Sequence, residues 1–477
     1  MEDLSLNIKK VLIVYLLLFV ALISYFSYFA IVKGEEVAYN PRNQRLAAKR
    51  NAVLRGTIYD RDGNALTKSE KTGKSTQTRE YIGGEAFTHI IGYNSSKYGR
   101  TGLENTYDKE LMAGSEFSFF DRFKDPEKIE KQVGNSIKLT IDSDLQKLAY
   151  NELRALGKNG AVVVLNPKNG EILALASAPS YDANNLDKIW ETISNDANAP
   201  LINRATSGVY PPGSTFKVVT TVSGLENMKG LEDKIFNDTG KLTFEGTNFI
   251  LKNSGGKAMG KINLETAFYR SSNVYFGNLA MELTNKNLRH TAEKFYFNKE
   301  IETEGFYISQ SKFPEIPSSD KSNIAQSGIG QSEIQATPIQ MALVASTIAN
   351  DGIMMKPKLV SEIINSEGET VKIFPDEELG RVTSREVADK VTEYMRLVVT
   401  KGTGSAAAVK GLYVCGKTGT ADHAKSITKQ ADAHSWFIGF APQEDPQIAL
   451  AVIVEEGGSG GGNAASIASK IFQAALK

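Results

Sequence analysis

One short segment combines a serine and a lysine at a spacing suited to catalysis: Tyr210-Pro-Pro-Gly-Ser-Thr-Phe-Lys217. The prolines and the glycine end one element, which predicts that Ser214 opens a helix. Residues three apart share one helix face, so the Ser214 hydroxyl and the Lys217 amine can meet at its N-terminus. The dipole there favours negative charge, and a desolvated lysine beside another cation loses its proton more easily. The spacing indicates a serine nucleophile with a lysine base, although a capping serine followed by a solvated lysine gives the same pattern.

Two further clusters favour the catalytic interpretation. In Arg270-Ser-Ser-Asn273, a hydroxyl (Ser271) and an amide (Asn273) stand two residues apart. In Lys417-Thr-Gly-Thr420, a cation is joined to two hydroxyls. Each cluster alone is a weak signal, but the order S-x-x-K, S-x-N, K-T-G is the arrangement of the penicillin-binding proteins and the serine β-lactamases.

Beyond these motifs, the whole chain resembles a class B penicillin-binding protein, a peptidoglycan D,D-transpeptidase. Residues 55–66, Arg-Gly-Thr-Ile-Tyr-Asp-Arg-Asp-Gly-Asn-Ala-Leu, resemble the opening motif of that family's N-terminal module. Residues 329–338 and 434–442 resemble stretches of its transpeptidase domain. Two positions depart from the family pattern without removing a catalytic group: Ser332 stands where a glycine is usual, and Cys415 where a small residue such as alanine is usual.

The resemblance implies a role for each polar residue of the three motifs. Ser214 would attack the carbonyl of the penultimate D-Ala of a stem peptide and form an acyl-enzyme, while Lys217 takes its proton. Ser271, linked to Lys217 and Lys417, would pass a proton to the departing D-Ala. Asn273 would hold the amide of the peptide.

The resemblance also implies how the rest of the substrate is held. Thr418, Gly419 and Thr420 would bind the substrate, with the two hydroxyls and Lys417 receiving its terminal carboxylate. The backbone N–H groups of Ser214 and Thr420 would form the oxyanion hole, where losing one donor typically costs about 3–4 kcal/mol of barrier. An amine from a neighbouring strand would then resolve the ester and make the cross-link.

Composition excludes several other kinds of chemistry. The 477 residues carry 55 Lys and Arg against 55 Asp and Glu, and this balance argues against a nucleic-acid binder. A single cysteine allows no intrachain disulfide, and the four histidines show no HExxH spacing. We therefore expect no metal and no cofactor.

An uncharged apolar run, Val11–Val32, precedes all of these motifs. As a helix it would be roughly 33 Å long, enough to cross a bilayer core of about 30 Å. A cleaved signal peptide would have a shorter apolar region and an A-x-A-like end, so we interpret the run as an uncleaved anchor. Lysines precede it at positions 9 and 10, whereas two glutamates soon follow it. The positive-inside rule therefore predicts a single-pass protein of the cell membrane, with a cytoplasmic N-terminus and an extracellular or periplasmic catalytic domain.

The remaining sequence indicates an α+β architecture. Residues 160–165 and 171–176 are predicted to form strands of one hairpin, and residues 436–440 and 448–454 two later strands, before a last helix at 467–476. Strands at both ends of a mostly helical stretch suggest an antiparallel sheet flanked by helices, with an inserted helical lobe. The expected division is a tail (1–10), an anchor (11–32), a small β-rich non-catalytic module (33–134) and a transpeptidase domain (135–477).

Three features suggest other chemistry only superficially. Residues 411–418 fit the P-loop pattern GxxxxGK[ST], but Leu, Tyr, Val and Cys at its centre predict a strand, and a poor helix start follows. No acid is placed by sequence to orient His423 as a base, and His434 begins a strand. Cys415 is best interpreted as a small buried residue.

Related enzymes with the same three motifs remain alternatives. A D,D-carboxypeptidase would send water instead of an amine to the acyl-enzyme. A serine β-lactamase would lack the N-terminal module, and a β-lactam sensor would carry more membrane spans. A wall-synthesis scaffold with a vestigial site would not need an intact Ser214, Lys217, Asn273 and Lys417.

The expected ligands are peptidoglycan stem peptides and β-lactam antibiotics. Only about a hundred residues separate the anchor from the transpeptidase domain, too few for a glycosyltransferase domain. The resemblance therefore implies a partner polymerase, a membrane glycosyltransferase of the shape-elongation-division family.

Overall fold

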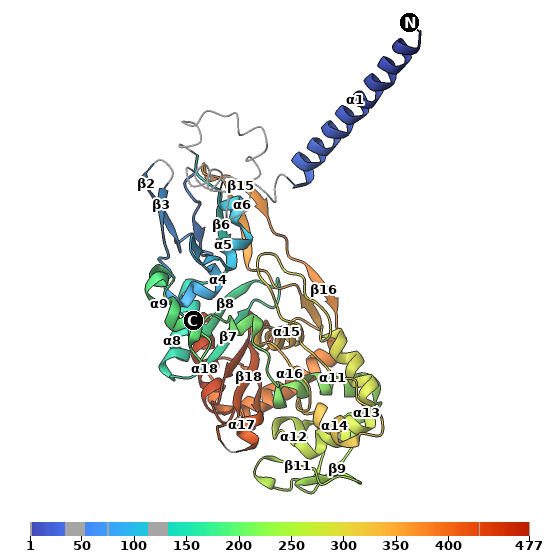
Figure 1. The fold of residues 1–477 in the computed structure, drawn as a ribbon. Helices are drawn as coiled ribbons and strands as arrows, with labels where there is room; N and C mark the ends of the chain where they lie inside the picture. The colour runs from blue at the N-terminus through green and yellow to red at the C-terminus, as the bar shows by residue number, and fades with distance from the viewer. Residues whose placement is uncertain (1, 34–52, 74–75, 113–131, 429, 477) are drawn as a thin grey trace.

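The computed structural model describes residues 2–33, 53–73, 76–112, 132–428 and 430–476. Over these ranges the chain forms an N-terminal helix, a small module and a larger domain built on an antiparallel sheet (Figure 1). The predicted α+β class is confirmed.

The N-terminal helix α1 (Glu2–Tyr28) ends in a π-helical turn, η1 (Phe29–Lys33). Within residues 7–33, an 18-residue window has a mean hydropathy of 2.4, and the large apolar side chains of this stretch are exposed. By length and composition this is a helix that can cross a membrane, in keeping with the predicted anchor.

The N-terminal module is organised by a turn and a buried ion-pair cluster. Asp60 Oδ1 accepts hydrogen bonds from the backbone N–H groups of Asp62 and Asn64, and Gly63 has a φ of +85°, so Asp62 and Gly63 form a tight turn. Arg55 Nε lies 2.5 Å from the carboxylate of Glu104 in the module interior. Its elements are β1 (Ile58–Tyr59), β2 (Lys68–Gly73), β3 (Thr76–Glu80), η2 (Glu85–Phe87), α4 (Thr88–Ile91), β4 (Asn94–Ser95), β5 (Gly99–Arg100), α5 (Gly102–Thr106) and α6 (Asp108–Leu111).

A four-stranded sheet joins this module to distant parts of the sequence. Strand β6 (Ser136–Leu139) pairs in parallel with β1 and antiparallel with β14 (Val360–Ile364), which in turn pairs with β15 (Thr370–Ile373). Figure 1 shows the blue module and the orange β15 side by side at one end of the molecule. The expected boundary at residue 134 therefore falls beside a strand that both parts share.

The larger domain is centred on a five-stranded antiparallel sheet with the order β17-β18-β19-β7-β8. Its strands are β17 (Cys415–Ala421), β18 (His434–Ala441), β19 (Ile448–Val454), β7 (Gly160–Leu165) and β8 (Ile172–Ala178). The three inner strands are buried on both faces, which explains why their sequences are almost continuously apolar rather than alternating.

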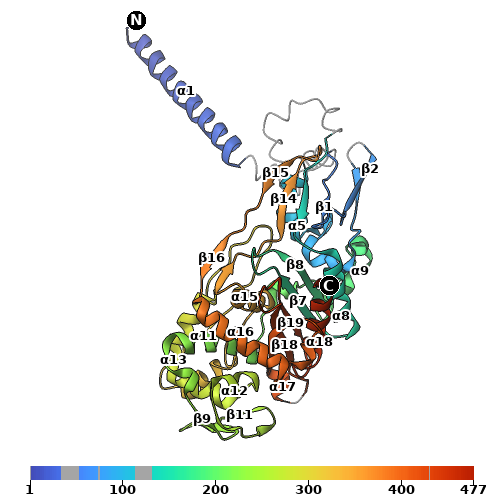
Figure 2. The ribbon, with the colours of Figure 1, turned by 180° about the vertical axis from the view of Figure 1, so that it is seen from behind.

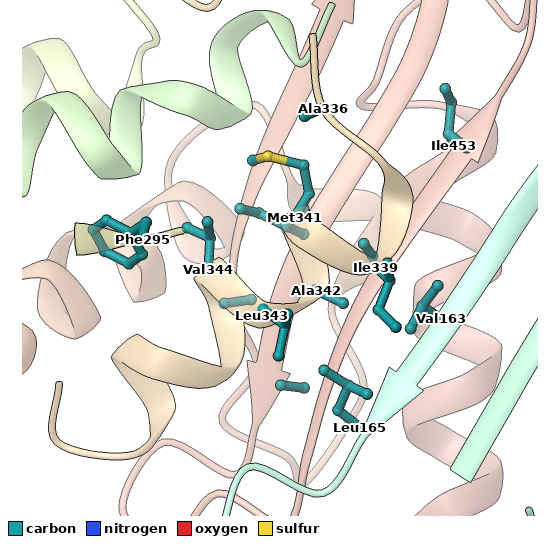
Figure 3. Packing of buried hydrophobic residues seen from close by; sticks show 14 of the residues in the cluster. Val163, Leu165, Phe295, Ala336, Ile339, Met341, Ala342, Leu343, Val344 and Ile453 are labelled. Atoms are coloured by element: carbon teal, nitrogen blue, oxygen red, sulfur yellow. The ribbon is translucent and has the colours of Figure 1, made fainter. Parts of the chain in front are cut away.

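Helices cover both faces of this sheet. On one face, α8 (Ser143–Ala155) and α18 (Asn463–Ala475) pack against the even-numbered residues of β7 and β19. On the other face lies α15 (Pro338–Ala349), and Figure 3 shows its Ile339, Ala342 and Leu343 beside Val163 and Leu165. Alternate residues of each strand thus pack into two separate hydrophobic cores, one on each face of the sheet.

The helical lobe lies beside the β17 edge of the sheet. Helix α16 (Arg385–Thr400) contacts both β17 and the lobe helices, and Figure 2 shows it running between them. The lobe helices are α11 (Lys217–Asn227), α12 (Leu264–Tyr269), α13 (Asn273–Lys294) and α14 (Lys321–Ser327). Short elements decorate the domain: η5 (Ala183–Asn185), α9 (Leu186–Asn195), α10 (Arg204–Ser207), η6 (Gly213–Phe216), η7 (Leu231–Asp233), β9 (Phe236–Asp238), β10 (Lys241–Thr243), β11 (Ile250–Lys252), η8 (Ser254–Gly256), β12 (Gly260–Ile262), β13 (Ile353–Met355), β16 (Glu378–Arg381), η9 (Ser405–Ala407) and α17 (Ala424–Ile427).

Candidate active site

The candidate nucleophile lies in a tight turn rather than in regular α-helix. Ser214 belongs to the 3-10 turn η6, and α11 begins only at Lys217. Gly213, with a φ of +54°, passes so close to β17 that an added Cβ would lie 2.6 Å from the Thr420 carbonyl oxygen. Only glycine tolerates both the conformation and the approach, so the P-P-G-S sequence sets Ser214 against the end of β17.

Lys217 is buried and points to the S-x-N motif. Its Nζ donates to Asn273 Oδ1 at 2.8 Å, to the Ser271 carbonyl oxygen at 2.9 Å and to Ser271 Oγ at 3.2 Å. Among the described residues, the partly exposed Ser214 hydroxyl has no hydrogen-bond partner, so the predicted contact between Ser214 and Lys217 is not made. Catalytic hydrogen bonds often tighten only when substrate is bound.

A second buried amine meets the same serine. Lys417 Nζ donates to Ser271 Oγ at 3.0 Å and to the Thr418 carbonyl oxygen at 3.0 Å. Ser271 itself has a φ of +59°, an uncommon conformation for a residue other than glycine. The Ser271 hydroxyl therefore lies between the two amines, where it can exchange a proton with either of them.

Burial controls the ionisation of both lysines. It lowers the pKa of Lys217 well below the usual value, and the nearby charge of Lys417 lowers it further, while Asp238 acts in the opposite direction. Burial lowers the pKa of Lys417 to about 7. A neutral amine is therefore accessible near neutral pH, which a lysine base requires.

The S-x-N motif is held in place by a buried aspartate, Asp238, which sequence reasoning did not single out. Asp238, in β9, accepts a hydrogen bond from Ser272 Oγ and two from Asn253 Nδ2, at 2.8 Å each. Asn253 Oδ1 in turn accepts from the backbone N–H groups of Asn273 (2.8 Å) and Val274 (3.1 Å). No short motif links positions 238 and 253 to the S-x-N segment, so only the fold could reveal them.

The K-T-G motif occupies β17, the edge strand beside the nucleophile turn. Lys417 is buried, whereas Thr420 is exposed and accepts a hydrogen bond from the Gly460 N–H at 3.3 Å. The Thr418 hydroxyl bonds to that of Thr403, another polar group that sequence reasoning missed. A Cβ at Gly419 would lie 3.0 Å from the Pro212 carbonyl oxygen, so this glycine permits β17 to approach the turn. The structure thus brings the three motifs together at the β17 edge of the sheet.

The features that suggested other chemistry have structural roles. Residues 415–421 form a strand that continues past Thr418, so no helix begins directly after the motif as a P-loop requires. Burial raises the pKa of Cys415 to about 12, so this thiol is not a nucleophile. The His423 ring stacks on His434 at a centroid distance of 4.2 Å and contacts the Asp432 carbonyl oxygen, so no acid orients it. Among the described residues, no cluster of three or more potential metal ligands occurs.

Comparison with known families agrees with this geometry. The penicillin-binding protein transpeptidase domain family matches residues 160–473, and the penicillin-binding protein A dimerisation domain matches residues 55–137. The chain is a class B penicillin-binding protein. The expected resemblance is thereby confirmed.

Individual members of this family are similar along almost the whole chain. The peptidoglycan D,D-transpeptidase PbpA of Mycolicibacterium smegmatis is 32% identical over 491 aligned positions, covering 99% of each chain. The ceftriaxone acyl-enzyme of penicillin-binding protein A from Mycobacterium tuberculosis has a TM-score of 0.84 at 31% identity, covering 90% of this chain and 100% of that one. A D,D-transpeptidase domain from Eggerthella lenta has a TM-score of 0.79 at 34% identity, covering 89% and 98%.

One departure from the family pattern has a structural explanation. Ser332 stands where the family usually has glycine, and its φ is +64°, in the left-handed region that favours glycine. Its hydroxyl donates to Asn323 Oδ1 at 3.1 Å, a contact that a glycine could not make.

Proposed function

We propose that this penicillin-binding protein is a peptidoglycan D,D-transpeptidase that cross-links stem peptides through an acyl-enzyme on Ser214, where β-lactams also react. The observation that carries the proposal is the pair of buried lysines, Lys217 and Lys417, converging on the Ser271 hydroxyl beside the Ser214 turn. This arrangement supplies a base and a proton relay without histidine or metal. The acyl-enzyme complexes of the mycobacterial relative support the same chemistry.

In the first half-reaction, Ser214 Oγ attacks the carbonyl carbon of the penultimate D-Ala and its proton passes to Lys217. The oxyanion of the tetrahedral intermediate accepts hydrogen bonds from the backbone N–H groups of Ser214 and Thr420. Ser271 then protonates the departing nitrogen of the terminal D-Ala and regains a proton from the lysines. The C–N bond breaks, and the acyl group remains on Ser214 as an ester.

Substrate recognition is assigned to the groups around that ester. Asn273 holds the amide of the donor peptide. The terminal carboxylate interacts with the hydroxyls of Thr418 and Thr420 and the charge of Lys417, with Gly419 leaving the strand backbone accessible. In the second half-reaction, an amine of a neighbouring stem peptide attacks the ester, its proton returns Ser214 to the hydroxyl form, and no cofactor takes part.

The direct test is mass spectrometry after incubation with benzylpenicillin. The mass of the intact antibiotic should appear on the peptide that contains residues 210–217, and Ser214→Ala should abolish it. Labelling of another peptide, or labelling that survives Ser214→Ala, would overturn the assignment.

We also propose that α1 anchors the protein with residues 1–10 in the cytoplasm and the catalytic domain outside. The lysines that precede the apolar run Val11–Val32 and the acidic residues that follow it support this orientation. Since Cys415 is buried, single cysteines introduced as Asp3→Cys or Lys257→Cys provide the test. A membrane-impermeant maleimide should label Lys257→Cys in intact cells and Asp3→Cys only after lysis.

A membrane glycosyltransferase of the shape-elongation-division family is the proposed partner. The segment between anchor and transpeptidase domain, residues 33–134, is taken as a non-catalytic module, so glycan polymerisation needs a separate enzyme. Affinity purification from native membranes should recover such a polymerase with the full chain, and should lose it when α1 is replaced by an unrelated membrane helix.

A further inference from the structure

An ionic cluster that no step of the proposed reaction uses lies next to the Ser214 segment. Glu455, just after β19, accepts hydrogen bonds from Tyr210 Oη at 2.7 Å and Arg204 Nε at 2.7 Å. Tyr210 and Arg204 are buried, and the guanidinium also donates to the backbone carbonyls of Asn198 and Ala199. Breaking such a paired group leaves an uncompensated buried charge, so the cluster is a rigid attachment point.

The carboxylate form of Glu455 is favoured within this cluster. Burial raises the pKa of Glu455, but the hydrogen bond from Tyr210 and the charge of Arg204 outweigh it and leave the pKa below its usual value. The acceptor for the Tyr210 hydroxyl is therefore a charged one at neutral pH, and hydrogen bonds to charged acceptors are stronger than those between neutral groups.

Tyr210 links this attachment point to the sheet that carries the K-T-G motif. Its ring packs edge-on against His434 and Trp436 of β18, with centroid distances of 5.6 and 6.2 Å. Its backbone N–H and carbonyl both pair with Ala336, at 3.0 and 2.8 Å. Tyr210 is thus fixed through its hydroxyl, its ring and its backbone.

The backbone between Tyr210 and Ser214 is also fixed, through Pro211 and Gly213. The Pro211 carbonyl oxygen accepts a hydrogen bond from Trp436 Nε1 at 3.1 Å, and the Gly213 N–H donates to the Gly330 carbonyl oxygen at 2.9 Å. The Ser214 hydroxyl, by contrast, has no partner among the described residues. The position of the nucleophile is therefore set by the backbone that precedes it.

We propose that Tyr210, Glu455 and Arg204 form a positioning cluster that fixes the spacing between Ser214 and the Thr420 end of β17. The inference rests on the proposed role of Ser214 as nucleophile. Both oxyanion donors, the N–H groups of Ser214 and Thr420, must lie correctly around one developing charge, and small displacements there reduce the rate of bond formation. Loosening the cluster should therefore slow acylation while leaving ligand binding in the cleft unchanged.

The test measures acylation of the full-length protein in detergent by a fluorescent penicillin over a range of concentrations. Saturation kinetics separate the acylation rate constant from the dissociation constant of the non-covalent complex. Tyr210→Phe should lower the rate constant about fivefold, the scale of one lost hydrogen bond, and change the dissociation constant less than twofold.

A matched control is available on the opposite side of the sheet. Tyr150 is also buried and also donates to a carboxylate, Glu85 Oε2, at 2.8 Å. Tyr150→Phe removes a comparable hydrogen bond and should alter neither kinetic constant. A general loss of stability would instead affect both variants alike.

Glu455→Gln provides the second variant, because it retains an acceptor but loses the charge. Because Arg204 also loses its charged partner, the rate constant of this variant should fall at least as far as that of Tyr210→Phe, and it decides the question if Tyr210→Phe does not fold. Equal rate constants for Tyr210→Phe and Tyr150→Phe, or a change in the dissociation constant alone, would overturn the inference. A wild-type protein that is not labelled on Ser214 would instead refute the proposed function.

Discussion

At the scale of single residues, the site depends on one hydroxyl shared by two amines. Ser271 Oγ lies 3.2 Å from Lys217 Nζ and 3.0 Å from Lys417 Nζ, and neither lysine forms an ion pair with a carboxylate within the described part of the chain. Two positive charges so close in a dry site are mutually unfavourable. At least one amine is therefore neutral near pH 7, and we assign this state to Lys217.

Lys217→Arg tests that assignment directly. Guanidinium stays protonated at any accessible pH, so the variant keeps the positive charge but cannot take the proton of Ser214. Acylation by benzylpenicillin should slow at least a hundredfold, the scale of lost general-base catalysis. Lys257→Arg, at an exposed lysine, serves as the control and should react normally. Acylation of Lys217→Arg at the wild-type rate would reject Lys217 as the base.

The buried Lys417 also makes stability depend on pH. Its pKa is about 7 in the folded protein against 10.5 as the reference value, so between these values the unfolded chain binds more protons. Stability should consequently rise as the pH increases from 7 to 9.5, by roughly 3 kcal/mol. Urea unfolding across this range should show a smaller rise for Lys417→Met, with Lys217 supplying the remainder. Identical slopes for the two proteins would contradict the assigned shift.

The candidate catalytic residues could be predicted from the sequence because their chemistry is encoded in short, ordered motifs. Ser214, Lys217, Ser271, Asn273 and Lys417 were all selected in this way. Their supporting residues were not, because a buried aspartate or glutamate acquires its role only from contacts made through folding. Asp238 accepts a hydrogen bond from Ser272, which lies 34 positions later in the chain. Glu455 accepts one from Tyr210, which lies 245 positions earlier.

At the scale of elements, the site depends on a strand packed unusually close to a turn. Glycines on both sides make this possible: Gly213 in the turn and Gly419 in β17. At Gly419 an added Cβ would lie 2.9 Å from Thr215 Cγ2, 3.0 Å from the Pro212 carbonyl oxygen and 3.0 Å from Trp436 Cβ. Gly419 does not have a positive φ, so its requirement is for space alone.

Gly419→Ala should therefore push β17 away from the nucleophile turn. The oxyanion donor of Thr420 moves with the strand, and the rate constant for acylation should fall by one to two orders of magnitude, somewhat less than removing that donor outright. Gly157→Ala is the control: its φ of +60° makes it strained, but nothing lies within 4 Å of the added Cβ. It should cost stability without slowing acylation. If Gly419→Ala is acylated at the wild-type rate, the close approach of β17 to the turn is not required for acylation.

Long apolar elements were predictable, whereas short polar ones were not. Residues 160–165 and 448–454 form strands with the predicted bounds. Helix α18 begins at Asn463, four residues before the predicted start, because small residues at its N-terminus obscure the apolar periodicity. The hairpins β9–β12 and β10–β11, which frame the S-x-N motif, have three-residue strands without a periodic signal.

At the scale of the whole molecule, the N-terminal module and the catalytic domain are joined by shared secondary structure. The sheet β1-β6-β14-β15 draws strands from both, and Asp60 in the module accepts a hydrogen bond from Ser143 Oγ at 2.5 Å. The predicted boundary at residue 134 follows a change in composition. It therefore falls just before β6, a strand of this shared sheet. The module is therefore an integral support of the catalytic domain.

A transpeptidase and a hydrolase form the same acyl-enzyme, so the choice between them depends on which nucleophile resolves the ester. A transpeptidase should shield the ester from water and admit an amine along the cleft, so the penicillin adduct on the full-length protein should persist for many minutes. With a thioester analogue of the stem peptide, adding a D-amino acid should divert product from hydrolysis to aminolysis in proportion to its concentration. Liquid chromatography of the products measures this ratio, and Ser214→Ala gives the background. Release of the adduct within seconds would favour a β-lactamase. If no acceptor at any concentration competes with water, the protein is a D,D-carboxypeptidase instead.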